Sequence, residues 1–150
     1  MSTIPHTILQ FLHSQTCATI CGINAEQVPS CFNCFYAIDE TNGYLLFKSK
    51  SESCHSQWLR FHPIIAGTVL PDTLNVLNIQ GVQWEGRVIE ATATIARNAW
   101  KCYHKRHPAA LLIPGNIWII QLEKIKMTSG SKPLGKKLNW VRGKADYMLI

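Results

Sequence analysis

The spacing of apolar residues along the chain predicts two kinds of element. In three segments apolar residues recur every three or four positions, as they do on one face of a helix, and Ile4, Ile8 and Leu12 begin the first of them. The remaining apolar segments are short and β-branched or alternating, which is typical of strands. The predicted helices span 4–15, 53–62 and 92–107, and the predicted strands span 16–24, 31–38, 44–49, 64–70, 74–90, 118–127 and 136–141.

The connections between these segments decide how the strands pair. Most are too short to hold the crossover that parallel strands need, so antiparallel hairpins are expected. Gly81 and Gly86 fall inside one long strand and predict a bulge or bend of the kind that a closed sheet requires. We therefore expect a mainly β (α+β) fold, an antiparallel barrel of about six or seven strands with about three flanking helices, in a single domain over residues 1–150.

Composition narrows the classes of protein further. With 47% hydrophobic and 16% charged residues, the 150-residue chain is expected to fold, and no apolar run reaches the length of a membrane span. No export signal is visible at the start, so a cytoplasmic location is the default expectation. The net charge of +6 is carried by loose groups near residues 101–107 and 132–144. No nucleic-acid motif accompanies them, so a solvated or phosphate-binding face is favoured over nucleic-acid binding.

The six cysteines are expected to be reduced and packed as small apolar groups. Cys31 and Cys34 have the spacing of a zinc-binding pair, but no second pair of this kind exists. Both lie in a predicted strand, where residues three apart point to opposite faces. No metal site is therefore predicted.

The segment from Tyr44 to Val69 holds the main candidate chemistry. A strand ends in a turn rich in hydroxyls and lysine, and a short helix follows: Ser49, Lys50 and Ser53 precede the start of that helix. Backbone N–H groups and the helix dipole make such a start a binding site for a phosphate-sized anion, although serines before helices are also ordinary caps. No GxSxG, HExxH or Walker A sequence occurs, and no paired carboxylates suggest acid–base catalysis.

The same segment resembles the FMN phosphate-binding segment of the pyridoxamine-phosphate oxidase-like split barrels. That family has an aromatic strand, a Thr or Ser, then Ser-Arg-Lys opening a helix that ends in Asn-Pro; here Ser49, Ser53-Cys54-His55 and His62-Pro63 hold these places. The chain is similar in particular to the uncharacterised YhbP-type branch. The similar segments are FYAID at 35–39, GVQWEG at 81–86, IWIIQLEKIKMT at 117–128 and GKKLNWVR at 135–142.

This resemblance implies a split β-barrel that acts as a homodimer and binds FMN at the subunit interface. By the same resemblance, one group of residues holds the phosphate, a second lies along the flavin through backbone contacts, and a third borders the ring, the ribityl chain or the cleft. In that order the groups are Ser49, Lys50, Ser53, Cys54 and His55; Asn33, Cys34 and Phe35; and Gln83, Lys137 and Trp140.

The chain departs from the family pattern at two positions. Cys54 stands where the family often has Arg, and His55 where it has Lys. A thiol and a group with an unperturbed pKa near 6.5 therefore replace two permanent cations, which predicts weak, pH-dependent FMN binding. The leading hypothesis is an FMN-dependent oxidoreductase of unknown substrate. The alternatives are a non-enzymatic flavin or haem carrier on the same barrel and, less favoured, a module associated with nucleic acid.

Overall fold

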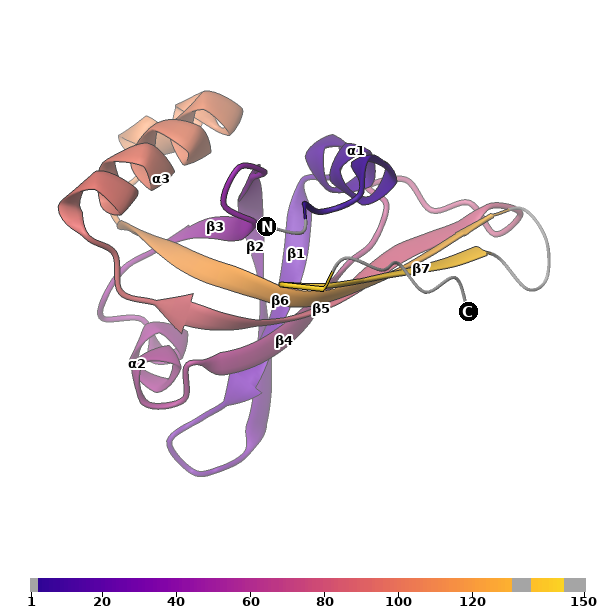
Figure 1. Ribbon diagram of the computed structural model, residues 1–150. Coiled ribbons are helices and arrows are strands. Elements are labelled where there is room, and N and C mark those ends of the chain that lie inside the picture. The colour runs from indigo at the N-terminus through magenta and orange to yellow at the C-terminus, as the bar shows by residue number, and fades with distance from the viewer. Residues whose placement is uncertain (1–2, 131–135, 145–150) are drawn as a thin grey trace.

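The computed structural model describes residues 3–130 and 136–144, which contain seven strands, three α-helices and one 3-10 helix (Figure 1). Residues 132–135 of the second basic group lie outside the described residues. In chain order the elements are α1 (His6–Ser14), β1 (Cys17–Ile23), β2 (Pro29–Asp39), β3 (Tyr44–Ser49), α2 (Cys54–Phe61), β4 (Ile64–Val69), β5 (Ile79–Ile89), α3 (Ala93–Arg106), η1 (Pro108–Leu112), β6 (Asn116–Gly130) and β7 (Lys136–Val141).

The strands form one antiparallel sheet in the order β3-β2-β1-β4-β5-β6-β7. An additional pairing of β3 with β6 closes the first six strands into a barrel, and β7 lies outside it. Strand β6 makes this possible because it is long: Asn116 to Gln121 pair with β3, and Lys124 to Ser129 pair with β7. The predicted mainly β fold, a small antiparallel barrel with three helices, is confirmed.

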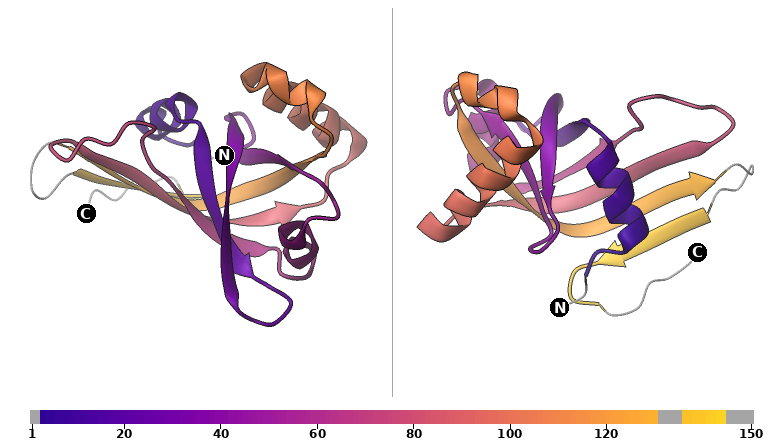
Figure 2. Two further views of the ribbon diagram at one scale, coloured as in Figure 1. Left: turned by 180° about the vertical axis from the view of Figure 1, so that it is seen from behind. Right: turned by 90° about the horizontal axis from the view of Figure 1, so that it is seen from above.

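The barrel has two hydrophobic layers, one inside it and one on its surface. Inward-facing side chains of the barrel strands fill the interior. Helix α1 adds Ile8, Phe11 and Leu12 to this core, and α2 adds Trp58 and Leu59. Helix α3 packs outside the barrel through Ala99 and Tyr103, against residues of β2, β3 and β6. Figure 2 shows α1 and α3 apart from one another, each over a different part of the sheet.

The structure tests two details of the prediction for strand β5. The register of β5 and β6 shifts between Glu85 and Gly86, which confirms the predicted irregularity at Gly86. Strand β5 begins at Ile79, so the prediction of strand from residue 74 was wrong. The residues before Ile79 form a turn instead. The Asn75 side-chain carbonyl accepts the Leu77 N–H at 2.9 Å, a hydrogen bond typical of turns.

Gly67 on β4 marks the tightest approach in the barrel. A Cβ at this position would lie 2.1 Å from the Thr19 carbonyl oxygen and 2.3 Å from the Trp84 ring. We expect Gly67→Ala to lower the free energy of unfolding by about 1–3 kcal/mol, the usual cost of overpacking. Urea denaturation measures this, and Gly81→Ala is the matched control because the nearest atom to its Cβ is 3.7 Å away. Equal stability of the two variants would contradict the argument.

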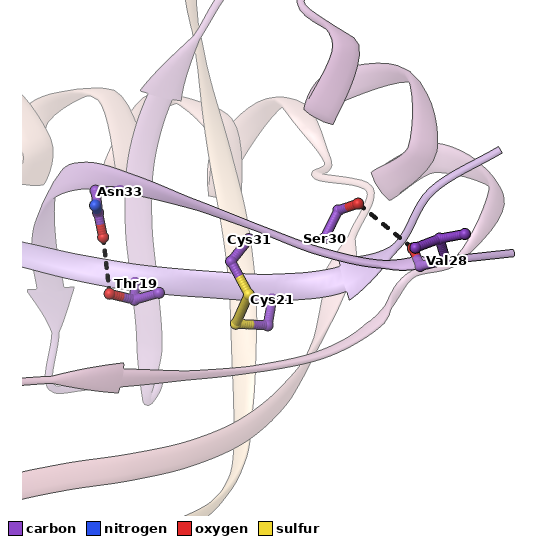
Figure 3. Close-up of a disulfide and its surroundings, with 6 residues drawn as sticks. All are labelled: Thr19, Cys21, Val28, Ser30, Cys31 and Asn33. Carbon is purple, nitrogen blue, oxygen red and sulfur yellow. Dashed lines mark hydrogen bonds between the residues drawn. A yellow bond between two sulfur atoms is a disulfide. The ribbon is translucent and has the colours of Figure 1, made fainter. Parts of the chain in front are cut away.

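The structure also contains a disulfide between Cys21 and Cys31 (Figure 3). The expectation that all six cysteines are reduced was therefore wrong for this pair. The two residues lie directly opposite one another in the β1–β2 register, which brings their side chains together. Spacing in the sequence alone did not show this register. Cys17, Cys34, Cys54 and Cys102 are free thiols.

Candidate functional site

The candidate site lies where β2 and β3 separate. The register pairs these strands from Tyr36 to Asp39 of β2, so within the described part of the chain the earlier residues of β2, 29–35, pair only with β1. One edge of this segment therefore presents backbone N–H and C=O groups that β3 does not occupy. Strand β3 instead continues to Ser49 and leads into α2. The barrel is split at this point, and the split leaves room for a ligand beside β2.

A cavity of about 590 Å³ occupies this split. Its size is within the usual range of small-molecule sites. The walls come from the edge of β2, the end of β3, the start of α2, the end of α3, and η1 with the two prolines around it. Among the described residues, the lining set contains no Asp or Glu. It consists of Phe32, Asn33, Cys34, Phe35, Lys48, Ser49, His55, Tyr103, Arg106, His107, Pro108, Ala109, Ala110, Ile113 and Pro114.

A cluster of hydroxyl groups at the start of α2 adjoins the cavity through Ser49, which is the member of the cluster that lines it. Ser53 caps the helix, and its side-chain oxygen accepts the Ser56 backbone N–H. The Ser49 and Ser53 hydroxyls lie 3.0 Å apart, and the Ser56 hydroxyl lies 3.2 Å from that of Ser49. The Ser53 and Ser56 hydroxyls both donate to the Lys50 carbonyl oxygen, at 2.9 and 2.7 Å. The strand end and the helix start thus present several hydroxyls and the first helical N–H groups together.

His55 lies directly against this cluster. Its Nε2 atom is 2.7 Å from the Ser49 hydroxyl oxygen, and its ring stacks on Phe32 with centroids 3.9 Å apart. Burial lowers the pKa of His55 from its usual value of 6.5. The imidazole is therefore mainly neutral at pH 7 and shares a hydrogen bond with the hydroxyl that an anion would contact.

The lowered pKa of His55 predicts a contribution to pH-dependent stability. Because the unfolded chain binds this proton more readily than the folded chain, the contribution is complete above pH 6.5 and is lost as the pH falls below that value. We expect the loss of melting temperature between pH 7.5 and 5.5 to be smaller in His55→Gln than in the wild type. Thermal unfolding followed by circular dichroism checks this, with His6→Gln, an exposed histidine on α1, as control. A loss as large in His55→Gln as in the wild type would contradict it.

The wall where β3 meets α3 and η1 carries the positive charge of Lys48, whose side chain is held in place by hydrogen bonds. The Lys48 ammonium donates to the Ala110 carbonyl oxygen at 2.7 Å and lies 3.0 Å from Nε2 of the buried His104. Nδ1 of His104 lies 2.8 Å from the Trp100 carbonyl oxygen, so Nδ1 holds the proton and Nε2 accepts from Lys48. This arrangement ties η1 to β3 and α3. Lys48 thereby fixes the cleft wall and leaves one N–H for other partners.

Two further titratable groups in the cavity, Cys34 and Tyr103, are neutral at pH 7. Burial raises the pKa of the Cys34 thiol to about 12 and that of the Tyr103 hydroxyl to about 12. Neither is ionised as a nucleophile or base at neutral pH. The cavity therefore combines hydroxyls, cations and apolar walls, a set that suits binding and orientation of an anionic, aromatic ligand.

The sequence-predicted residues fall into three places. The cavity lining brings together Asn33, Cys34, Phe35, Ser49 and His55. Ser53 belongs to the hydroxyl cluster, whereas Lys50 and Cys54 are exposed beside it, and it is the Lys50 carbonyl that joins the cluster. Gln83 and Trp140 lie elsewhere, at a second cavity of about 520 Å³ over β4, β5, β6 and β7, and Lys137 is exposed on β7.

Sequence reasoning missed several residues that shape the cavity. Lys48 precedes Ser49, and alternation along a strand would place its side chain on the opposite face, yet that side chain reaches the lining. Phe32 and Ser56 were not singled out. Ser56 was detectable as a polar residue on the apolar face of α2, where it is fully buried. Arg106 and His107 belong to the basic group at the end of α3, which had been interpreted as a solvated or phosphate-binding face without reference to this cavity.

Two properties of the described residues bound the chemistry. Within residues 3–130 and 136–144, no three His, Cys, Asp or Glu side chains gather so as to hold a metal ion. None of the helices described there has the length and apolar character that a membrane span requires.

Known structures of the same shape define the class of fold. A heme binding protein from Mycobacterium smegmatis superimposes with a TM-score of 0.72 at 13% identity, covering 93% of this chain and 55% of that one. A pyridoxamine 5'-phosphate oxidase-related, FMN binding protein from Nostoc punctiforme superimposes with a TM-score of 0.70 at 9% identity, covering 96% and 94%. The chain therefore has the fold of the pyridoxamine-phosphate oxidase-like split barrels.

The sequence places the chain more closely. No protein-family model matches it. A UPF0306 protein from Yersinia enterocolitica is 30% identical over 135 residues, which are 90% of this chain and 91% of the relative. The chain belongs to the UPF0306 (YhbP-type) family, as the resemblance predicted.

Proposed function

We propose that this single-domain protein binds FMN in the cleft between β2 and β3 and acts as an oxidoreductase on a substrate still to be identified. The observation that carries the proposal is the hydroxyl cluster of Ser49, Ser53 and Ser56 at the start of α2, with His55 beside it. These hydroxyls and the first helical N–H groups lie around Ser49, which lines a cavity with apolar walls, and this arrangement suits a phosphate attached to an aromatic ring system.

The residues along β2 support the position of the flavin ring. At Asn33, Cys34 and Phe35 no described residue pairs with the strand on its β3 side, so its backbone groups are available to the polar edge of a flavin. We propose that Phe35 and Tyr103 enclose the ring. When bound, FMN would supply the two-electron chemistry. This is consistent with a lining that, among the described residues, contains no Asp or Glu to act as an acid or base.

We further propose a homodimer, with Gln83, Lys137 and the groove beside Trp140 placed toward the cleft of the partner subunit. Gln83 and Lys137 are exposed and lie away from the cleft of their own subunit. Exposed apolar residues such as Leu74, Val76 and Leu77 give a second copy surface to cover. The FMN-binding protein from Nostoc has the same fold over nearly its whole length, which supports the proposal for the cofactor.

An absorbance spectrum and mass analysis of the purified protein, followed by FMN titration, test this proposal. We expect flavin absorbance, or saturable quenching of FMN fluorescence, in a protein that sediments as a dimer. No flavin and no titration signal would contradict it.

A non-enzymatic carrier of flavin or haem is the second candidate. It is favoured by the match to a heme binding protein over 93% of this chain and by the two histidines in the lining, His55 and His107. A Soret band on haem titration would support it. Rapid reduction of bound FMN by NAD(P)H would count against it.

A further inference from the structure

The disulfide between Cys21 and Cys31 lies on the solvent side of the β1–β2 ladder. The inner face of this ladder carries Ala18 and Ile20, which are buried in the barrel. The alternate residues point outward, and the Thr19–Asn33 hydrogen bond is the next pair on that face (Figure 3). Cys31 is exposed and Cys21 is half-buried. External reagents can therefore reach the Cys31 sulfur without any opening of the barrel.

The fold does not depend on this cross-link for the alignment of the two strands. Backbone pairing already joins β1 and β2 at seven positions, from Cys17–Phe35 to Ile23–Pro29. The two cysteines are only ten residues apart in sequence, and cross-links that close short loops restrict the unfolded chain least. After reduction the paired strands would still hold the two thiols face to face, with Cα atoms 4.2 Å apart. Both redox states are thus compatible with the same barrel.

The other four cysteines differ from this pair. Cys34 and Cys102 are half-buried, and burial raises the pKa of both thiols, which makes them poor nucleophiles. Cys54 and Cys17 are exposed free thiols. Cys17 shares the outer face with Cys21, but four residues along a strand is about 13 Å, too far for a disulfide. Only Cys21 and Cys31 therefore combine access with an adjacent partner.

We propose that Cys21 and Cys31 form a reversible redox site that exchanges with low-molecular-weight thiols and disulfides. In the reducing direction an external thiolate attacks the Cys31 sulfur, the bond to Cys21 breaks, and Cys21 leaves as a thiolate that takes up a proton. A second external thiol then releases Cys31 as a thiol and departs as part of an external disulfide. The net reaction consumes two external thiols and yields the protein dithiol and one external disulfide.

The position of the pair gives this exchange a consequence in the cleft. Among the described residues, 29–35 of β2 pair only with β1, and the disulfide adds a side-chain cross-link to the hairpin that these two strands form. Phe32 follows Cys31 and stacks on His55 from that strand. Reduction is therefore expected to loosen the free edge of β2 beside the cleft. The proposal does not depend on FMN binding, because both strands and both thiols belong to the protein alone.

Thiol counting in glutathione buffers tests the proposal on the full chain. After alkylation under denaturing conditions, peptide mass spectrometry should find Cys21 and Cys31 joined to one another and unlabelled in excess oxidised glutathione, and both labelled in excess reduced glutathione, with unchanged far-UV circular dichroism. Cys17→Ser should keep the two-thiol step, whereas Cys31→Ser should abolish it. Amide exchange at residues 30–35 should be faster in the reduced protein.

Two results would overturn the proposal. A pair that stays oxidised in excess reduced glutathione until the protein unfolds would be a structural cross-link only. A pair that stays reduced in excess oxidised glutathione would not be a redox site at all. The wild-type titration decides between these outcomes even where a cysteine variant fails to fold. Exchange at residues 30–35 that is equal in both states would refute the link to the cleft.

Discussion

Replacing Ser53 by alanine is expected to weaken FMN binding by about ten- to hundredfold. Its hydroxyl lies 3.0 Å from that of Ser49, at the point where the strand end meets the start of α2. A hydrogen bond to a charged group contributes about 1.5–3 kcal/mol, and each 1.4 kcal/mol is a factor of ten in affinity. Isothermal titration calorimetry or flavin fluorescence measures the change directly, and the dimer is expected to persist.

The same substitution also removes a helix cap, so a matched control is needed. Ser53 accepts the Ser56 N–H at 3.4 Å, and losing such a cap costs about 0.5–2 kcal/mol of stability. Thr92 caps α3 in the same way, accepting the Ile95 N–H at 3.4 Å, and it does not line the cleft. Thr92→Ala should lose similar stability and keep its FMN affinity. Equal FMN affinity in Ser53→Ala and the wild type would place the phosphate elsewhere.

The sequence predicted the barrel well because its signals were local. Strands β1, β3, β4 and β7 and the helices followed from apolar periodicity, and the bend at Gly86 followed from a glycine inside a strand. The turn from Ser49 to Ser53 was recognisable because hydroxyls before a short helix have a specific use at helix starts. These features depend on residues close together in the chain.

Features that join distant segments were not predictable in this way. The Lys48 side chain meets His104 and Ala110, which lie 56 and 62 residues further along, so only the packing of α3 on the barrel brings them together. The Cys21–Cys31 disulfide depended on the exact register of a hairpin. The free edge of β2 depended on where β3 turns away. Each is a consequence of tertiary geometry, and Lys48 and the free edge of β2 directly shape the candidate site.

This division explains why the fold was clearer than the ligand. The strength of an anion site depends on the positive charges that face it. In this turn a thiol and an imidazole stand at the two positions where the related motif has permanent cations. Cys54 is exposed at the first position of α2, and His55, with its pKa lowered by burial, is mainly neutral at pH 7. The proposed phosphate site therefore has hydroxyls and helical N–H groups, but these two positions supply no permanent positive charge.

Restoring that charge is expected to have the second large effect. The double substitution Cys54→Arg with His55→Lys should strengthen FMN binding by about ten- to hundredfold at pH 7.5, because two permanent cations replace a thiol and a neutral imidazole beside the hydroxyl cluster. Calorimetric titration of both proteins with FMN measures the gain. Gln57→Lys is the matched control, since Gln57 is exposed on the same helix and does not line the cleft.

The pH dependence of that gain separates a local contact from a general increase in charge. His55 gains its proton only below pH 6.5, so the wild type should acquire a cation at the site as the pH falls through this range. Protonation of the FMN phosphate, with a second pKa of about 6, weakens binding most where the site carries most positive charge, so it reduces the advantage of the double variant in the same direction. The ratio of the double variant's FMN affinity to that of the wild type should therefore fall between pH 7.5 and 5.5. The same ratio for Gln57→Lys should stay constant, because that lysine does not face the phosphate. A constant advantage across this range would show that His55 does not contact the bound phosphate.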